Sequence, residues 1–233
     1  MELIGLTEKP VAQILFCLFI AFLTSYAVAP LAIFLAKKLN AIDMPGSAVH
    51  KRHALPTPLA GGLTLFIALP ILIFFSSLWR EVTLRPIFLG GVVIFSFGMA
   101  DDIYGLSAPK KFLGQFLATA ILIYFGTTIR FLETVHLPLK MPLLTVLNWG
   151  LTLFWVVGIT NAFNLVDSMD GLLAGLTIIM ASFFSFFAFV AGQTMLAQFT
   201  AMLAGASIAL YIYNKSPARF FLGGVVIFSF GMA

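Results

Sequence analysis

The chain has 233 residues, of which 61% are hydrophobic and 9% are charged, and its formal net charge is +4 at pH 7. A soluble globular domain carries about 25% charged residues, so the composition excludes an ordinary soluble domain and indicates an integral membrane protein. The basic residues are scattered beside apolar segments, which argues against a nucleic-acid partner and suits a lipid bilayer. Cys17 is the only cysteine, so no intrachain disulfide can form.

Eight apolar runs follow one another along the chain. A membrane-spanning helix needs about 20 apolar residues, and glycine and proline are tolerated inside such helices. The first run is longer than the core of a signal peptide, so we expect it to be retained. The sequence predicts one domain over residues 1–233, an all-α polytopic transmembrane bundle of seven to eight helices at roughly 11–36, 59–79, 85–100, 112–129, 146–164, 171–191, 195–213 and 219–233.

The charges predict which loops share a side of the membrane. With seven crossings before Asn214, one side carries eight Lys and Arg residues and the other carries five, and the positive-inside rule makes the first side cytoplasmic. All five aspartates fall on that side and all four glutamates on the other. The mixed segment 130–145 lies on the glutamate side and predicts a short hairpin or re-entrant piece. Acids that act together must share a face, so we expect a cytoplasmic active site.

The first acidic motif is the pair Asp101–Asp102, which ends an apolar run and is followed by Lys110, Lys111 and Gln115. Carboxylates at a membrane boundary are costly unless they are paired, solvated or bound to a cation. Adjacent helical residues point about 100° apart, so one carboxylate can bind a metal while the other acts as a base or holds a second ligand. The pair predicts a magnesium or phosphate site, with the lysines as donors to a diphosphate.

The second acidic motif, NAFNLVDSMDG, runs from Asn161 to Gly171. Asp167 and Asp170 are three residues apart, and Asn164 precedes Asp167 by three. This spacing places the three side chains on one face if the segment is helical. Amides beside carboxylates can recognise a base or a sugar while the carboxylates handle charge.

A third polar segment, the loop 37–62, contains His50, Lys51, Arg52 and His53 beside Asp43. Clustered cations next to a membrane suit phosphate groups, and ordinary positive-inside anchoring explains them equally well. We do not expect a zinc site, because no cysteine or further local histidine completes one.

Residues 88–100 recur without change at 221–233. Repeat architectures show diverged copies at a regular period, so one perfect copy needs another explanation. The first copy leads into Asp101, whereas the second stops one residue before the equivalent position. We expect a misjoined or chimeric sequence, ahead of a recent duplication or truncation. A functional tandem helix is the least favoured reading, because the copy lacks the acidic pair.

Together the motifs resemble the polyprenyl-phosphate N-acetylhexosamine-1-phosphate transferases. That group includes bacterial undecaprenyl-phosphate GlcNAc-1-phosphate transferases and phospho-MurNAc-pentapeptide transferase. The resemblance covers about residues 10–223, and NAFNLVDSMDGL is closer to the GlcNAc branch. The matching pieces are Asp43–Pro45, Lys51–His53, Pro56–Pro58, Gly61–Gly62, Asp101–Asp102, Lys111 with Gln115, Asn161–Gly171 and Tyr213–Gly223.

The resemblance implies a reaction at the cytoplasmic face of a bacterial inner membrane. The phosphate of undecaprenyl phosphate attacks the β-phosphate of a UDP-N-acetylhexosamine, UMP leaves, and a lipid-linked diphosphosugar forms. It implies Mg²⁺, or Mn²⁺, held by Asp102, with Asp101 as base or as a second ligand. A covalent aspartyl-phosphate intermediate is an alternative, and a homodimer is compatible with the family. The implied catalytic residues are Asp101, Asp102, Asp167 and Asp170, and the implied substrate contacts are Lys51, Lys111, Asn161, Asn164 and Asn214.

The sequence departs from the family pattern after Gly223. The family continues with an aspartate that binds magnesium, where this chain has Gly224, and its later helices and histidine-rich loop have no counterpart here. The glycine at position 224 therefore counts against enzymatic activity of the 233-residue chain. Two alternatives stay open: a catalytically inactive, truncated paralogue, and a cation-coupled transporter. Against the transporter, the acids cluster at one face and not at the midplane.

Overall fold

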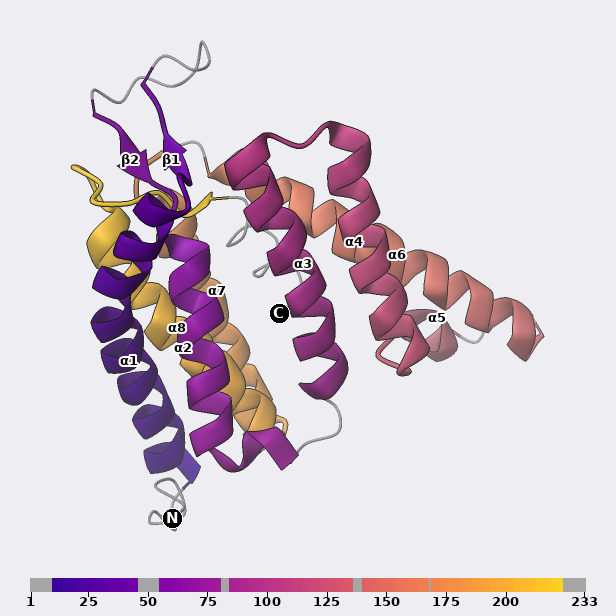
Figure 1. The fold of residues 1–233 in the computed structure, drawn as a ribbon. Helices are drawn as coiled ribbons and strands as arrows, with labels where there is room; N and C mark the ends of the chain where they lie inside the picture. The colour runs from indigo at the N-terminus through magenta and orange to yellow at the C-terminus, as the bar shows by residue number, and fades with distance from the viewer. Residues whose placement is uncertain (1–9, 46–54, 81–83, 136–139, 168, 224–233) are drawn as a thin grey trace.

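The computed structural model describes residues 10–45, 55–80, 84–135, 140–167 and 169–223, and these residues form a bundle of α-helices (Figure 1). Five of the described helices, α1, α3, α6, α7 and α8, are long and apolar enough to cross a membrane, and α2 is a shorter apolar helix. The predicted all-α, polytopic membrane fold is confirmed. The elements are α1 (Pro10–Lys38), β1 (Ile42–Asp43), β2 (Thr57–Pro58), α2 (Gly61–Phe75), the 3-10 helix η1 (Ser77–Arg80), α3 (Leu84–Tyr104), α4 (Ala108–Tyr124), α5 (Phe131–Thr134), α6 (Met141–Val166), α7 (Leu172–Val190) and α8 (Thr194–Asn214).

Helix α8 packs between α1 and α7 and is the most buried of the long helices (Figure 1). Small side chains let helix backbones approach closely in a membrane, where van der Waals packing supplies the attraction. The approach is closest at Gly205 of α8, where a Cβ atom would collide with the carbonyl oxygen of Leu18. Helix α1 faces α8 with small buried residues spaced three or four apart: Cys17, Ala21, Ser25, Ala29, Ala32 and Ala36.

Helices α3, α4 and α6 form a second group beside the first (Figure 1). Helix α3 packs tightly on α4, because a Cβ on Gly114 would lie 2.5 Å from the Phe97 ring. Helix α4 meets α6 through a polar bond in which Asn161 Nδ2 donates to Gln115 Oε1 at 3.0 Å. The acidic motifs lie at the ends of α3 and α6, so the packing of this group sets their positions.

The segment 130–145 differs from its prediction. Among its described residues, Phe131–Thr134 form the short helix α5, and Met141 already begins α6. Pro142 lies in the first turn of α6, where a proline removes only an N–H that has no intrahelical acceptor. The spanning helix therefore starts earlier than the predicted position 146, whereas the predicted hairpin or re-entrant piece includes residues 136–139, which lie outside the described part of the chain.

The predicted helix at 219–233 does not start at 219. Phe221 forms a parallel bridge with Leu59, and the described residues from 219 to 222 are not helical. The reason lies in α2, whose first N–H groups have no acceptor within their own helix and take the carbonyl groups of Phe221 and Leu222 instead. The rest of the second repeat copy, residues 224–233, lies outside the described part of the chain.

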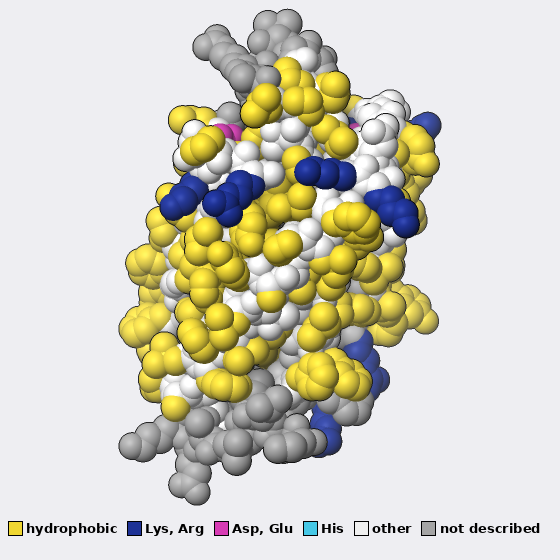
Figure 2. Space-filling model, turned by 60° about the vertical axis from the view of Figure 1, so that its left-hand side comes forward, with side chains coloured by type: hydrophobic (Ala, Val, Ile, Leu, Met, Phe, Trp, Pro, Cys, Tyr) yellow, Lys and Arg dark blue, Asp and Glu magenta, His cyan; other side chains and the backbone are white. Residues whose placement is uncertain are grey.

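A broad hydrophobic surface covers the side of the molecule drawn in Figure 2, with a row of Lys and Arg side chains across it toward one end. Two basic residues, Lys37 and Lys38, occupy the last turn of α1. Large apolar side chains are also exposed on α6 and α7, among them Phe154, Phe183 and Phe187. An apolar belt with basic residues at its edge is the surface expected of a protein that lies in a bilayer.

Candidate functional site

Four connecting segments meet at one end of the bundle, the upper end in Figure 1. They are the loop between α1 and α2 with β1 and β2, the turn between α3 and α4, the turn between α6 and α7, and the segment after α8. Contacts between these segments, given below, place them against one another. The five aspartates lie in or beside them at positions 43, 101, 102, 167 and 170.

Asp101 is tied to the turn that leads into α4. Its Oδ2 atom lies 2.8 Å from Nζ of Lys111, and the two side chains are 15% and 36% exposed. Its Oδ1 atom accepts a hydrogen bond from the backbone N–H of Leu106 at 2.8 Å. Gly105, with a φ of 65°, takes the left-handed conformation that ends many helices. Both carboxylate oxygens of Asp101 thus have partners, Leu106 in the turn and Lys111 in the first part of α4, which fixes their position.

Asp102 faces the segment that follows α8. A Cβ atom on Gly223 would lie 2.7 Å from Oδ2 of Asp102. Gly223 also has a φ of 76°, a left-handed conformation that a glycine adopts without strain. This position therefore needs glycine for its backbone and for the space beside the carboxylate.

The residues before Gly223 are held by the start of α2. The N–H of Phe221 donates to the carbonyl of Pro58 at 3.0 Å, and the carbonyl of Phe221 accepts from the N–H of Gly61 at 3.2 Å. The carbonyl of Leu222 accepts from the N–H of Gly62 at 3.1 Å. A Cβ on Gly61 would lie 2.8 Å from Cα of Leu222. These contacts join the first loop of the chain to its last described segment.

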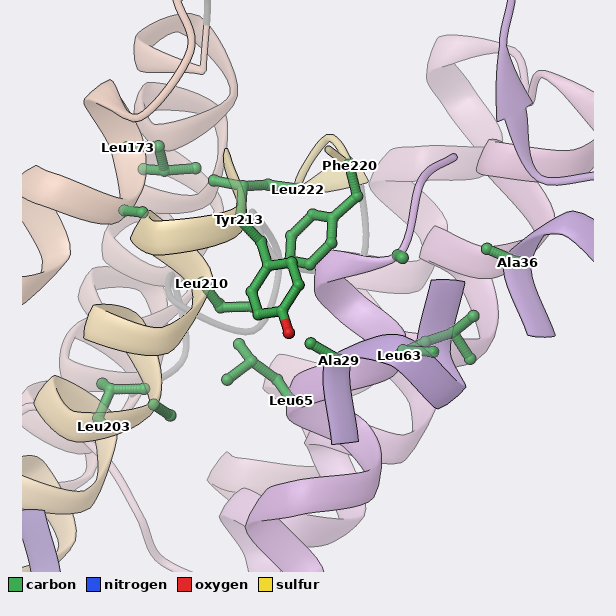
Figure 3. Close-up of a cluster of buried hydrophobic side chains, with 14 of the residues drawn as sticks. Ala29, Ala36, Leu63, Leu65, Leu173, Leu203, Leu210, Tyr213, Phe220 and Leu222 are labelled. Carbon is green, nitrogen blue, oxygen red and sulfur yellow. The ribbon is translucent and has the colours of Figure 1, made fainter. Parts of the chain in front are cut away.

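A buried apolar cluster supports this junction from below (Figure 3). The ring of Phe220 is fully buried and stacks on Tyr213, with ring centroids 5.5 Å apart and planes 5° apart. Leu210 of α8 and Leu65 of α2 lie beside the rings (Figure 3). Close packing of this kind resists displacement, so the polar segments rest on a rigid base.

Asp167 directly follows α6, where its N–H donates to the carbonyl of Phe163 at 3.0 Å. Burial, and secondly the charge of Asp170, raise the pKa of Asp167 from 3.8 to about 6. An acid with a pKa near neutrality can accept or give a proton at physiological pH. Asn164 and Asp170 are exposed. The described residues after Val166 form a turn, so the predicted alignment on one helical face does not apply to Asp170.

Asn214, the last residue of α8, is 2% exposed. Its Oδ1 atom accepts from the N–H of Gly171 at 2.9 Å, and its Nδ2 atom donates to the carbonyl of Phe220 at 3.1 Å. The side chain therefore bridges the turn after α6 and the segment after α8.

Asn161 lies one helical turn before the end of α6. It donates to Gln115, which is 2% exposed, and to the carbonyl of Val157 at 2.7 Å. Gln115 lies one turn after Lys111 on α4, so this bond connects the helix that carries the lysine to the helix that leads into Asp167.

Some predicted site residues lie outside the described part of the chain, namely Lys51 with its neighbours His50, Arg52 and His53. The structure therefore does not place Lys51 relative to the acids. Among the described residues, no group of three or more His, Cys, Asp or Glu side chains gathers where it could hold a metal ion. The sequence predicts that the carboxylates of Asp101 and Asp102 bind a cation. Both residues lie in the described part of the chain, and that role stays a prediction.

Sequence reasoning included Gly171 and Gly223 as the last residues of two matching motifs but gave them no role in shaping the site. Gly171 directly precedes α7 and has a φ of 78°, and a Cβ there would lie 3.0 Å from the Tyr211 ring. Gly223 plays the corresponding part beside Asp102. Their only signal in the sequence is a glycine that ends an acidic or an aromatic motif, which fits many turns.

Comparisons with known proteins bear on all four segments. A family model for glycosyl transferase family 4 matches residues 84–233. The chain is 30% identical over 216 residues to the probable undecaprenyl-phosphate N-acetylglucosaminyl 1-phosphate transferase of Bacillus subtilis (strain 168), which covers 93% of this chain and 60% of that protein. It is 32% identical over 222 residues to the phospho-N-acetylmuramoyl-pentapeptide-transferase of Listeria monocytogenes serotype 4b (strain CLIP80459), which covers 88% of this chain and 68% of that protein.

A third relative shows a similar identity and coverage. The phospho-N-acetylmuramoyl-pentapeptide-transferase of Thermoanaerobacter sp. (strain X514) is 32% identical over 230 residues, which covers 91% of this chain and 70% of that protein. The chain thus spans 60% of the length of its Bacillus subtilis relative. The family match begins at the start of α3 and includes both acidic motifs. The resemblance inferred from these motifs is confirmed, and the chain belongs to glycosyl transferase family 4.

Proposed function

We propose that this protein transfers a sugar-1-phosphate from a UDP-N-acetylhexosamine to undecaprenyl phosphate and releases UMP, as the first membrane step in making a cell-envelope polysaccharide. The observation that carries the proposal is the position of two acidic motifs, Asp101–Asp102 and Asp167–Asp170, at the same end of a membrane bundle. The name of the Bacillus subtilis relative favours GlcNAc-1-phosphate as the transferred group.

The physical demands of this reaction match the placement of the site. The acceptor phosphate is attached to a polyprenyl chain that stays in the bilayer, so the reacting groups must meet at the membrane face. An oxygen of the lipid phosphate bonds to the β-phosphorus of the UDP-sugar. The bond from that phosphorus to the bridging oxygen breaks, and UMP leaves with the electron pair. Two anionic phosphates must approach each other, so cationic groups are needed to offset their repulsion.

Mg²⁺, or Mn²⁺, would supply part of this charge by neutralising phosphate oxygens and polarising the reacting phosphoryl group. Asp102, with Asp101 beside it, is our candidate holder. Mg²⁺ is usually bound by one or two carboxylates together with substrate phosphates and waters, so a pair of carboxylates is a suitable set of protein ligands. Lys111, 2.8 Å from Asp101, keeps a positive charge next to this position.

The remaining acids and amides have proposed roles in binding and proton transfer. Asp101 accepts the proton of the lipid phosphate or shares the cation, and attack by an aspartate to form an aspartyl phosphate is the alternative. Asn164, Asp167 and Asp170 shape the pocket for the nucleotide and sugar, with Asn161 behind them. Lys51 is proposed as a phosphate contact from outside the described residues.

We place the protein in a bacterial inner membrane with the site on the cytoplasmic face. The support is the positive-inside count and the basic residues at the aspartate end of the bundle, including Lys37 and Lys38 of α1. UDP-sugars are water-soluble and must reach this face from the aqueous side. A homodimer is compatible with the proposal, which does not depend on it.

The test is UMP release from membranes that contain the chain, supplied with UDP-GlcNAc, undecaprenyl phosphate and Mg²⁺. We expect release that needs all three additions and is lost in Asp102→Asn, with the variant still inserted in the membrane. Unchanged turnover in Asp102→Asn would remove the proposed metal role.

A substitution at Gly224 provides a second test of the proposed function. If this position lacks a metal ligand, Gly224→Asp should raise UMP release. No release from either chain would favour an inactive paralogue. Cation flux without UMP release would favour a transporter.

A further inference from the structure

The side chain of Asn214 joins two parts of the candidate site that are far apart in the sequence. It accepts from the N–H of Gly171 at 2.9 Å and donates to the carbonyl of Phe220 at 3.1 Å. Both bonds are buried, and the side chain is 2% exposed. The polar atoms of Asn214 that the structure shows bonded are therefore directed at the protein backbone.

On one side, the bond fixes the turn that carries Asp170. Gly171 follows Asp170 and directly precedes α7, in a left-handed conformation. Its Cα lies against α8, because a Cβ there would be 3.0 Å from the ring of Tyr211 and 3.5 Å from Cα of Lys215. The backbone next to Asp170 is therefore set by α8, through packing and through the amide of Asn214.

On the other side, the bond fixes the segment that reaches Asp102. Phe220 is fully buried against Tyr213. Three residues further on, Gly223 lies against the Asp102 carboxylate. Between them, the carbonyls of Phe221 and Leu222 accept from the first N–H groups of α2. A shift of Phe220 would therefore move Gly223 relative to Asp102 and disturb the hydrogen bonds to the start of α2.

We propose that Asn214 is a positioning residue that sets the Asp167–Asp170 turn relative to Asp102, and so couples nucleotide binding at the turn to cation binding at Asp102. The inference rests on the proposed function. A side-chain amide offers one acceptor and two donors in a fixed plane, which matches an N–H on one side and a carbonyl on the other. Aspartate would present acceptors to both, and alanine would leave two buried backbone groups without a partner.

Hydrogen exchange on the full chain in lipid nanodiscs tests the bridge itself. We compare the unaltered chain with Asn214→Ala, Asn214→Asp and the control Ser207→Ala. Ser207 is also buried in α8, but it bonds only within its own helix, to the carbonyl of Leu203 at 2.7 Å.

The three variants have distinct expected signatures. Asn214→Ala should speed exchange about tenfold at Gly171 and at Gly61–Gly62, because one hydrogen bond is lost on each side. Asn214→Asp can still accept from Gly171 but faces the carbonyl of Phe220 with an oxygen, so only Gly61–Gly62 should loosen. Equal protection in Asn214→Ala and Ser207→Ala would overturn the proposal. Faster exchange along all of α8 would overturn it as well, because that would indicate a general packing defect.

Titration with UMP, with and without Mg²⁺, tests the coupling. In the unaltered chain we expect Mg²⁺ to tighten UMP binding. In Asn214→Ala the affinity without Mg²⁺ should stay within about threefold, and most of the Mg²⁺-dependent gain should disappear. An intact gain in this variant would overturn the coupling. If the unaltered chain binds no UMP, the proposed function fails, and the exchange experiment alone decides whether Asn214 is the bridge.

Discussion

Gly223 and Asp102 lie close together although 121 positions of sequence separate them: a Cβ atom at Gly223 would lie 2.7 Å from Oδ2 of Asp102. The contact puts the last described segment of the chain against the carboxylate that we assign to cation binding. It also makes the position sensitive to a single methyl group, since Gly223 has a φ of 76°.

Gly223→Ala should therefore impair the site strongly. A methyl group would push against the Asp102 carboxylate and would strain the left-handed backbone by about 1–2 kcal/mol. We expect the Mg²⁺ concentration for half-maximal UMP release to rise at least about tenfold. The matched control is Gly91→Ala, because a Cβ at Gly91 meets nothing within 4 Å. Equal Mg²⁺ requirements in the two variants would show that the close contact does not matter for cation binding.

We expect UMP release to depend on both the positive charge of Lys111 and the length of its side chain. Lys111→Met removes the partner at 2.8 Å from Asp101, and we expect UMP release to fall about tenfold or more, as when a cationic donor is lost from a phosphoryl-transfer site. Lys111→Arg keeps the charge and should retain more activity. Lys110→Met changes the second lysine predicted as a phosphate donor. Lys110 is exposed, and the ion pair with Asp101 is made by Lys111, so we expect a smaller loss at Lys110. A loss of the same size at Lys110 would point to a diffuse charge requirement.

The raised pKa of Asp167 predicts a pH dependence of stability. The carboxyl has its usual pKa of 3.8 when unfolded and about 6 in the folded protein. The folded state thus binds the proton more tightly, so its stabilising contribution is full below about pH 4 and is lost as the pH rises through about 6. Asp167→Asn cannot ionise, so it should melt at a higher temperature than the unaltered chain at pH 8 and at nearly the same temperature at pH 4.

The higher melting temperature of Asp167→Asn should be accompanied by lower activity. Asp167→Asn should reduce UMP release, since its carboxylate is proposed to shape the substrate pocket. A variant that is less stable at pH 8, or one that keeps full activity, would contradict the assigned burial or the assigned role. Asp170→Asn offers a further check, because removing its charge should lower the pKa of Asp167.

The contact between α1 and α8 should tolerate no added methyl group. In Gly205→Ala the new Cβ would overlap the carbonyl oxygen of Leu18, and overpacking of this kind typically costs about 1–3 kcal/mol. Gly158→Ala is the control, because a Cβ at Gly158 of α6 meets nothing within 4 Å and alanine favours a helix. Thermal unfolding in one detergent should show a lower midpoint for Gly205→Ala alone.

The sequence was sufficient to predict the long helices α1, α3, α6, α7 and α8, because their apolar runs are long enough to cross a membrane. Alternation of the loops then predicted that the aspartates share one end. The sequence was not sufficient for contacts that depend on two distant segments. Nothing near Phe221 shows that its carbonyl will serve the first N–H groups of α2, so a helix was predicted where the chain is not helical. The bridge made by Asn214 was not predictable for the same reason, since one of its two partners, Gly171, lies 43 residues before it.

The hydrogen bonds between Gly61–Gly62 and Phe221–Leu222 have a consequence for biosynthesis. A ribosome releases the first pair long before the second, so the start of α2 has no such acceptor while α3 to α8 are made. A nascent chain that stops short of Phe221 already carries every aspartate, yet Asp102 has no glycine beside it and the α2 amides have no acceptor. The face that holds the acids is therefore completed late, by the arrival of a few residues that bear no charge.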